Sequence, residues 1–61
     1  MNKEEIKKYI IERLNHFDEI SISNPYYNNE NCREDKKILI KELEEKFNCE
    51  IDYISYEIKF N

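Results

Sequence analysis

The sequence predicts an α+β fold in which two helices cover one face of a small sheet, and two copies of the chain join their sheets. Two stretches with apolar residues at helical spacing, near the start and in the middle of the chain, predict the helices. A final run over residues 51–60 alternates apolar and polar side chains, which is typical of a strand. The 61 residues suffice for a single small domain, residues 1–61, in the order α-β-α-β.

The first helix is predicted over residues 3–19. Asn2 is its expected N-cap, because an asparagine side chain accepts a hydrogen bond from the backbone N–H three residues later, here that of Glu5. The apolar residues of its inner face recur at intervals of three and four: Ile6, Ile10, Leu14 and Phe17. This stripe predicts a helix that packs on a core.

A short strand and a loop are predicted next. Residues 20–23 read Ile-Ser-Ile-Ser, and this alternation predicts a strand. Residues 24–31 are expected to form a loop, because Asn24-Pro25 breaks regular structure and asparagines tolerate turn conformations. The chain contains no glycine, so residues such as asparagine must serve every left-handed position.

The second helix is predicted over residues 32–47, followed directly by the strand over 51–60. Its inner face carries Leu39, Leu43 and Phe47. Asn48 is the expected C-terminal cap, because asparagine accepts the left-handed conformation that ends many helices.

The strand over 51–60 is longer than the strand over 20–23, so most of its backbone N–H and C=O groups lack a partner within the chain. Such an edge recruits a second copy of the chain or another protein. We therefore expect a homodimer that forms through the C-terminal strand. Whether the two strands of one chain pair parallel or antiparallel stays open, because the connection is long enough for both.

Tyrosines and apolar strand residues are the expected contact residues, because tyrosine combines a rigid apolar ring with a polar tip. Tyr26 and Tyr27 lie together in the predicted loop, where they either contact a partner or fold back over the core. The residues expected at a self-association or partner interface are Tyr26, Tyr27, Tyr53, Ile54, Tyr56, Ile58 and Phe60.

The charge balance argues against a nucleic-acid ligand. The chain has ten basic and fourteen acidic residues and a formal net charge of −4, whereas phosphate binding needs a basic patch. Lys36, Lys37 and Lys41 come closest to one, but acidic neighbours surround them in the sequence. No apolar stretch is long enough to cross a membrane and no signal peptide is present, so we expect a cytoplasmic protein.

Catalytic, metal and cofactor sites are not expected. Cys32, Cys49 and His16 do not have the close spacing of zinc ligands. In the cytoplasm the two cysteines are expected to be reduced, with a disulfide between them as the alternative. His16 follows Glu12 by one helical turn, but no nucleophile can be assigned beside this pair, so we expect no enzymatic activity.

An open strand edge, a tyrosine pair and no catalytic set favour a non-enzymatic protein that inhibits or modulates a larger protein by surface contact. One alternative is a small regulatory or antitoxin-like protein that neutralises a cognate partner. Another is a small-ligand binder whose pocket lies at a dimer interface and is lined by Tyr53, Tyr56 and His16.

In its length, its mild acidity and its richness in Asn, Ile, Lys, Glu and Tyr, the chain resembles the small acidic inhibitors that bacteriophages encode against bacterial defence. These include anti-CRISPR proteins and the short dimeric inhibitor of the Hachiman system. The resemblance implies stoichiometric blocking of an immune protein in the bacterial host cytoplasm. It implies no functional residue, because such inhibitors share no sequence motif.

Overall fold

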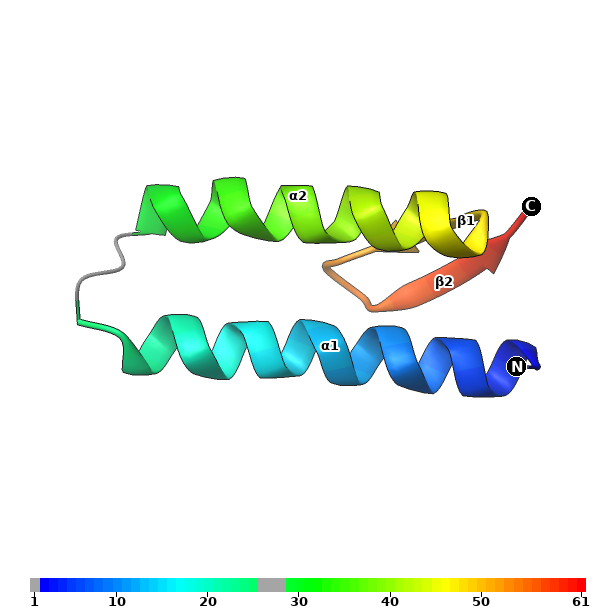
Figure 1. Ribbon diagram of the computed structural model, residues 1–61, viewed down its shortest axis with the longest axis horizontal. Helices are drawn as coiled ribbons and strands as arrows, with labels where there is room; N and C mark the ends of the chain where they lie inside the picture. The colour runs from blue at the N-terminus through cyan, green and yellow to red at the C-terminus, as the bar shows by residue number, and fades with distance from the viewer. Residues whose placement is uncertain (1, 26–28) are drawn as a thin grey trace.

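The computed structural model describes residues 2–25 and 29–61. Its elements, in chain order, are α1 (Lys3–Ser23), α2 (Asn29–Phe47), β1 (Cys49–Asp52) and β2 (Glu57–Phe60). The two helices run antiparallel, and the hairpin of β1 and β2 lies beside them at the end that holds both termini (Figure 1). Two helices and one small sheet agree with the predicted α+β class, but the order is α-α-β-β and not α-β-α-β.

α1 begins as predicted. The backbone N–H of Glu5 donates to Asn2 Oδ1 over 2.9 Å, so Asn2 caps the helix. Glu4 and Glu5 place negative charge in the first turn, where the exposed N–H groups of the helix favour it.

The predicted strand over residues 20–23 does not form, because these residues are the last turn of α1. The Ser23 hydroxyl donates to the carbonyl oxygens of Glu19 and Ile20, at 2.9 and 3.1 Å, and thereby satisfies two acceptors at the helix end. The helix stops at Asn24, which is extended (φ −95°, ψ 108°) because a following proline disfavours the helical conformation. The alternation of isoleucine and serine was therefore a misleading signal.

α2 begins at Asn29, so residues 29–31 of the predicted loop 24–31 are helical. Glu30 in the first turn suits the positive end of the helix dipole. The helix ends at Phe47, and Asn48 is left-handed with φ 51°. The prediction of Asn48 as the residue that ends α2 is confirmed.

The predicted strand over residues 51–60 is divided into β1 and β2 by a turn over residues 53–56. Asp52 Oδ1 accepts from the N–H groups of Ile54 and Ser55, at 3.0 and 3.4 Å, and these bonds fold the chain back. They also lower the pKa of the Asp52 carboxyl, because they stabilise its charged form. Tyr56 completes the reversal with φ 57°, a left-handed conformation that costs a non-glycine residue about 1–2 kcal/mol.

β1 and β2 pair antiparallel, with Ile51 opposite Ile58. Three pairs further along, the Asn61 N–H donates to the Asn48 carbonyl oxygen over 3.2 Å. In an antiparallel ladder, hydrogen-bonded pairs alternate with pairs whose backbone groups point outward. Because the Asn48–Asn61 pair is hydrogen-bonded and lies three pairs away, the backbone groups of the Ile51–Ile58 pair point outward. Each of these two residues therefore presents its N–H and C=O at an outer edge of the hairpin.

α2 covers the outer edge of β1. The Ile51 N–H donates to Glu44 Oε2 over 2.9 Å, so a carboxylate occupies the place that another strand would take. The Ile58 N–H, at the outer edge of β2, has no such carboxylate in the part of the chain described.

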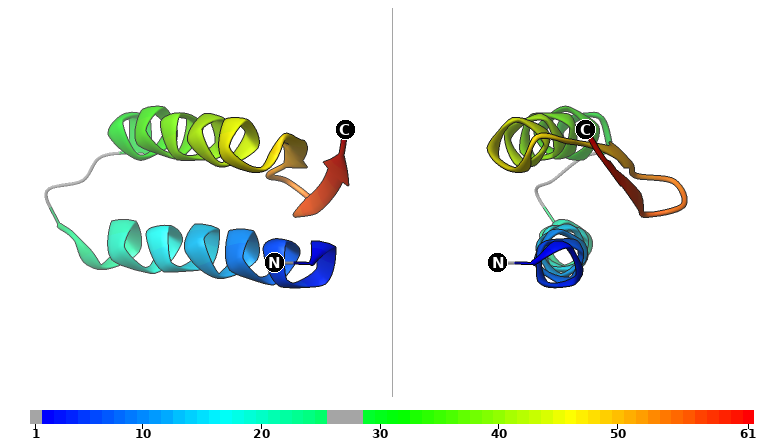
Figure 2. Two further views of the ribbon diagram at one scale, coloured as in Figure 1. Left: turned by 45° about the vertical axis from the view of Figure 1, so that its right-hand side comes forward. Right: turned by 90° about the vertical axis from the view of Figure 1, so that its right-hand side faces the viewer.

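The core lies where α1, α2 and the hairpin meet. Its buried residues are Ile10, Leu14, Ile40, Leu43, Cys49 and Ile51. Seen end-on, the hairpin stands to one side of the helix pair, and within residues 2–25 and 29–61 no strand covers the opposite side (Figure 2). The two sides of the helix pair therefore differ, and each carries a candidate binding surface.

Candidate binding surfaces

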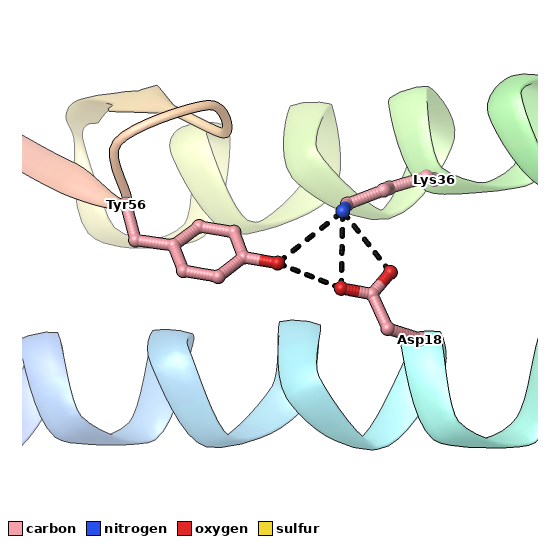
Figure 3. A network of polar contacts seen from close by, with 3 residues as sticks. All are labelled: Asp18, Lys36 and Tyr56. Atoms are coloured by element: carbon pink, nitrogen blue, oxygen red, sulfur yellow. Dashed lines mark hydrogen bonds and ion pairs between the residues drawn. The ribbon is translucent and has the colours of Figure 1, made fainter.

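A polar network joins both helices to the turn of the hairpin (Figure 3). The Tyr56 hydroxyl donates to Asp18 Oδ2 over 2.7 Å, and Lys36 Nζ lies 3.0 Å from Asp18 Oδ1. Lys36 also donates to the Tyr56 hydroxyl oxygen over 3.4 Å. One carboxylate on α1 thus accepts from a cation on α2 and from a hydroxyl on the turn.

The network stabilises the charged form of Lys36. Partial burial opposes the charged ammonium, but the hydrogen bonds and charges of Asp18 and Tyr56 together outweigh it, so the pKa of Lys36 is raised. The ammonium also lies 5.5 Å from the centroid of the Tyr56 ring, within reach of a cation–π interaction. These contacts offset the strain of the left-handed Tyr56 backbone.

Beside this network lies an open groove of about 340 Å³, here called the basic groove. It lies on the hairpin side of α2 and is lined by Arg33, Lys36, Lys37, Ile40 and Tyr53. Lys36 is paired with Asp18, whereas Arg33 and Lys37 form no ion pair among the described residues. The groove therefore offers two unpaired cations beside an aliphatic and an aromatic side chain.

The helix brings three cations together in the basic groove and turns one of their acidic neighbours, Asp35, away from it. Positions three and four apart lie on the same face of a helix, which brings Arg33, Lys36 and Lys37 together. Asp35 lines a different groove, whereas the exposed Glu34 precedes Lys37 by three positions and lies near its face of α2. That acidic neighbours cancel most of the field of the α2 lysines stays a prediction.

A second open groove, of about 430 Å³, lies between α1 and α2 and is here called the helix groove. α1 contributes Arg13, His16, Phe17 and Ile20, and α2 contributes Asp35, Ile38, Leu39 and Glu42. Ile20 and Ile38 are 51% and 56% exposed, so large apolar side chains face solvent here. Of the charged residues that line the groove, Arg13 on α1 is positive, whereas Asp35 and Glu42 on α2 are negative.

The helix groove faces away from the hairpin. Glu44 contacts β1 and Asp18 contacts the turn, whereas Glu42 and His16, each two residues earlier, line the groove. Residues two apart on a helix point in roughly opposite directions, at about 200° of rotation. The groove therefore opens on the side of the helix pair that no strand covers (Figure 2).

The predicted interface residues do not form one surface. Tyr53 and Ile54 lie in the turn and are 48% and 86% exposed. Tyr56, Ile58 and Phe60 are half-buried and pack against the core. Tyr26 and Tyr27 lie outside the described residues.

The other chemically reactive residues are spread over the fold. His16 lines the helix groove and Tyr53 the basic groove, so one chain does not bring the predicted ligand-pocket residues together. Cys32 and Cys49 are both free, and α2 separates them by roughly 22 Å, far beyond disulfide distance. The described residues contain no group of three or more side chains placed to bind a metal ion.

Sequence reasoning missed Asp18, Arg33 and the two exposed isoleucines of the helix groove. Arg33, Lys36 and Lys37 have helical spacing that signals a shared face. Ile20 and Ile38 gave no comparable signal, because an exposed isoleucine cannot be told from a core residue by its type. Asp18 meets Lys36 and Tyr56 only through tertiary structure.

Comparison with protein-family models, with curated proteins and with solved structures finds no significant match to this chain. Within the described residues, neither α1 nor α2 has a stretch apolar enough to span a lipid bilayer.

Proposed function

We propose that this protein is a non-enzymatic modulator that binds a larger protein stoichiometrically, with the basic groove as its contact surface. The lining of the basic groove carries this proposal, because Arg33 and Lys37, which form no ion pair among the described residues, lie there with Tyr53 in a chain of net charge −4. Two cations next to an exposed tyrosine match an acidic peptide segment that also carries an apolar residue.

An acidic protein segment fits this groove better than a nucleic acid does. A long polyanion would be repelled by the net charge of −4 and would meet only two unpaired cations. A short segment interacts mainly within the screening distance of about 8 Å at physiological salt, where the local cations dominate.

The groove alone supports only weak binding. Exposed ion pairs contribute about 0–1 kcal/mol each, and a partly exposed tyrosine adds a similar amount. We expect an isolated acidic peptide to bind with a Kd of roughly 10 mM. A whole partner protein would add contacts from the surrounding surface.

The resemblance to phage inhibitors suggests which partner is blocked. Under this proposal, the acidic segment belongs to a bacterial immune protein in the host cytoplasm, and its occupation by the chain prevents that protein from acting. The mechanism needs no reaction, only a one-to-one complex.

The proposal is tested by titrating the ¹⁵N-labelled protein with the synthetic peptide Asp-Glu-Leu-Asp-Glu-Leu. We expect amide shifts centred on Arg33, Lys37 and Tyr53. Lys37→Glu should abolish them, whereas Lys41→Glu, an identical change one turn later at an exposed position outside both grooves, should not.

Either of two results would overturn the proposal. Equal binding by the two variants would show that only the net charge matters. Equal shifts with inorganic phosphate at the same concentration would indicate a site for any anion and not for a peptide.

A further inference from the structure

We infer that two copies of the chain pack face to face across the helix groove and form an antiparallel four-helix bundle with the hairpins outside. This inference is independent of the basic groove, which lies on the hairpin side and stays accessible in such a dimer.

The helix pair is covered on one side only. The hairpin packs on the core from the other side, while Ile20 and Ile38 are more than half exposed in the helix groove. A chain of 61 residues buries a small core, and folds of this size commonly gain stability by association. A second layer of helices would cover this apolar surface.

Two contacts define which residues of α1 and α2 lie level with each other. The Tyr9 and Phe47 rings meet with centroids 5.6 Å apart, and Lys36 Nζ lies 3.0 Å from Asp18 Oδ1. The two helices are antiparallel (Figure 1). Arg13 follows Tyr9 by four positions and Glu42 precedes Phe47 by five, so Arg13 and Glu42 lie at about the same level.

A two-fold axis parallel to the helices would place each α1 over the partner's α2 and would keep these levels. The α1 side of the groove carries Arg13 and His16, and the α2 side carries Asp35 and Glu42. Arg13 of each copy would then meet the partner's Glu42. The groove is therefore complementary to itself in charge, which identifies a second copy as its occupant.

The same arrangement brings apolar groups together. By the same level argument, Phe17 lies near the level of Ile38, so the half-buried ring of one copy would cover the exposed isoleucine of the other. Helices packed in this way around shared apolar positions form the usual core of a four-helix bundle.

Two charge-reversed variants test the inference by mixing. Arg13→Glu alone and Glu42→Arg alone each create two like-charge contacts per dimer, so we expect the dissociation constant to rise about tenfold. In a mixed dimer both contacts are between opposite charges, one native and one reversed. Light scattering after size-exclusion chromatography should therefore show weakened dimers for each variant and a restored dimer for the equimolar mixture.

Mixing leaves the altered residue in each variant chain unchanged. Recovery of dimers in the mixture can therefore come only from contacts between the two copies. Circular dichroism checks that both variants retain helix. Should either variant fail to fold, isotope-filtered nuclear Overhauser effects between Phe17 of one unmutated copy and Ile38 of another provide the test.

Three results would overturn the inference: a wild-type monomer at every concentration examined, unchanged dimers in both variants, or weakened variants without rescue on mixing. Unchanged dimers would instead favour association through the outer edge of β2. None of these results bears on peptide binding in the basic groove, so the two proposals fail separately.

Discussion

The hydroxyl of Tyr56 donates a hydrogen bond of 2.7 Å to Oδ2 of Asp18, although 38 positions separate the two residues in the chain. This bond attaches the hairpin turn to α1, although α2 and β1 lie between these two segments in the sequence. It also stabilises a tyrosine in a left-handed conformation that residues without glycine's freedom adopt at a cost.

Removing this hydroxyl should therefore weaken the fold. We expect Tyr56→Phe to cost about 1 kcal/mol, because a carboxylate loses one donor while keeping Lys36. That loss corresponds to a melting temperature lower by about 5 °C, measured by circular dichroism. Tyr53→Phe, in the same turn and about half exposed, should leave the temperature unchanged.

Acid should weaken the turn through Asp52. Its pKa is lowered in the folded state by the N–H groups of Ile54 and Ser55, so the charged carboxylate favours folding. This contribution is present above the ordinary value of 3.8 and is lost as the pH falls through the lower folded value. We expect the stability advantage of the wild type over Asp52→Asn to shrink between about pH 7 and about pH 3.

The exposed Ile22, which has no titratable group, provides the control for this experiment. The stability difference between Ile22→Ala and the wild type should not change with pH. A stability difference between the wild type and Asp52→Asn that stays constant with pH would contradict the role of the Asp52 charge in the turn.

The core should tolerate little loss of volume. Leu14 is fully buried, so Leu14→Ala should cost about 3 kcal/mol. A chain of this length has only roughly 3–9 kcal/mol in total, so the variant should lose a third or more of its stability, measured as a lower midpoint in a urea titration. Ile22, which is 87% exposed, provides the control, and Ile22→Ala should change stability by less than about 0.5 kcal/mol.

The two faces of β2 should respond differently to a lysine. Ile58 is half-buried opposite Ile51, so Ile58→Lys should cost about 2–3 kcal/mol and lower the melting temperature by at least about 8 °C. Glu57 is exposed, and Glu57→Lys should melt near the wild-type temperature. Equal melting temperatures of the two variants, followed by circular dichroism, would show that the facing of β2 is wrong.

The two thiols should differ in reactivity. Burial raises the pKa of the Cys49 thiol, and the charge of Glu44 raises it further, so little thiolate forms. Cys32 is only half-buried. We expect a disulfide reagent to label Cys32 roughly tenfold faster than Cys49, with Cys32→Ser removing the fast phase.

The helices could be predicted from the sequence, but the sheet could not. Asn2, the apolar stripe of α1 and Asn48 are local signals, and the structure agrees with them because capping and helical periodicity act over a few residues. The run over residues 51–60 alternates apolar and polar side chains from Ile54 onward, yet the Asp52 side chain accepts from two backbone N–H groups and reverses the chain. Aspartate at the second position of a predicted strand was the available warning.

The candidate surfaces were harder to predict than the helices. Helical spacing alone could have grouped Arg33, Lys36 and Lys37. The helix groove depends on how two distant helices pack, which periodicity does not specify. The pairing of Asp18 with Tyr56 likewise requires the hairpin to fold back between elements that are remote in the chain.

The carboxylate of Glu44 accepts the Ile51 N–H and so occupies the outer edge of β1, which leaves the outer edge of β2 as the side of the hairpin where another strand can pair. A strand that is open on both sides can add copies without end, as in an amyloid fibre. Here a second hairpin can join through β2, but the resulting four-stranded ribbon would end at a carboxylate on each flank. We therefore expect Glu44 to confine strand addition to the β2 side, so that pairing of hairpins ends at two copies instead of growing into a fibril.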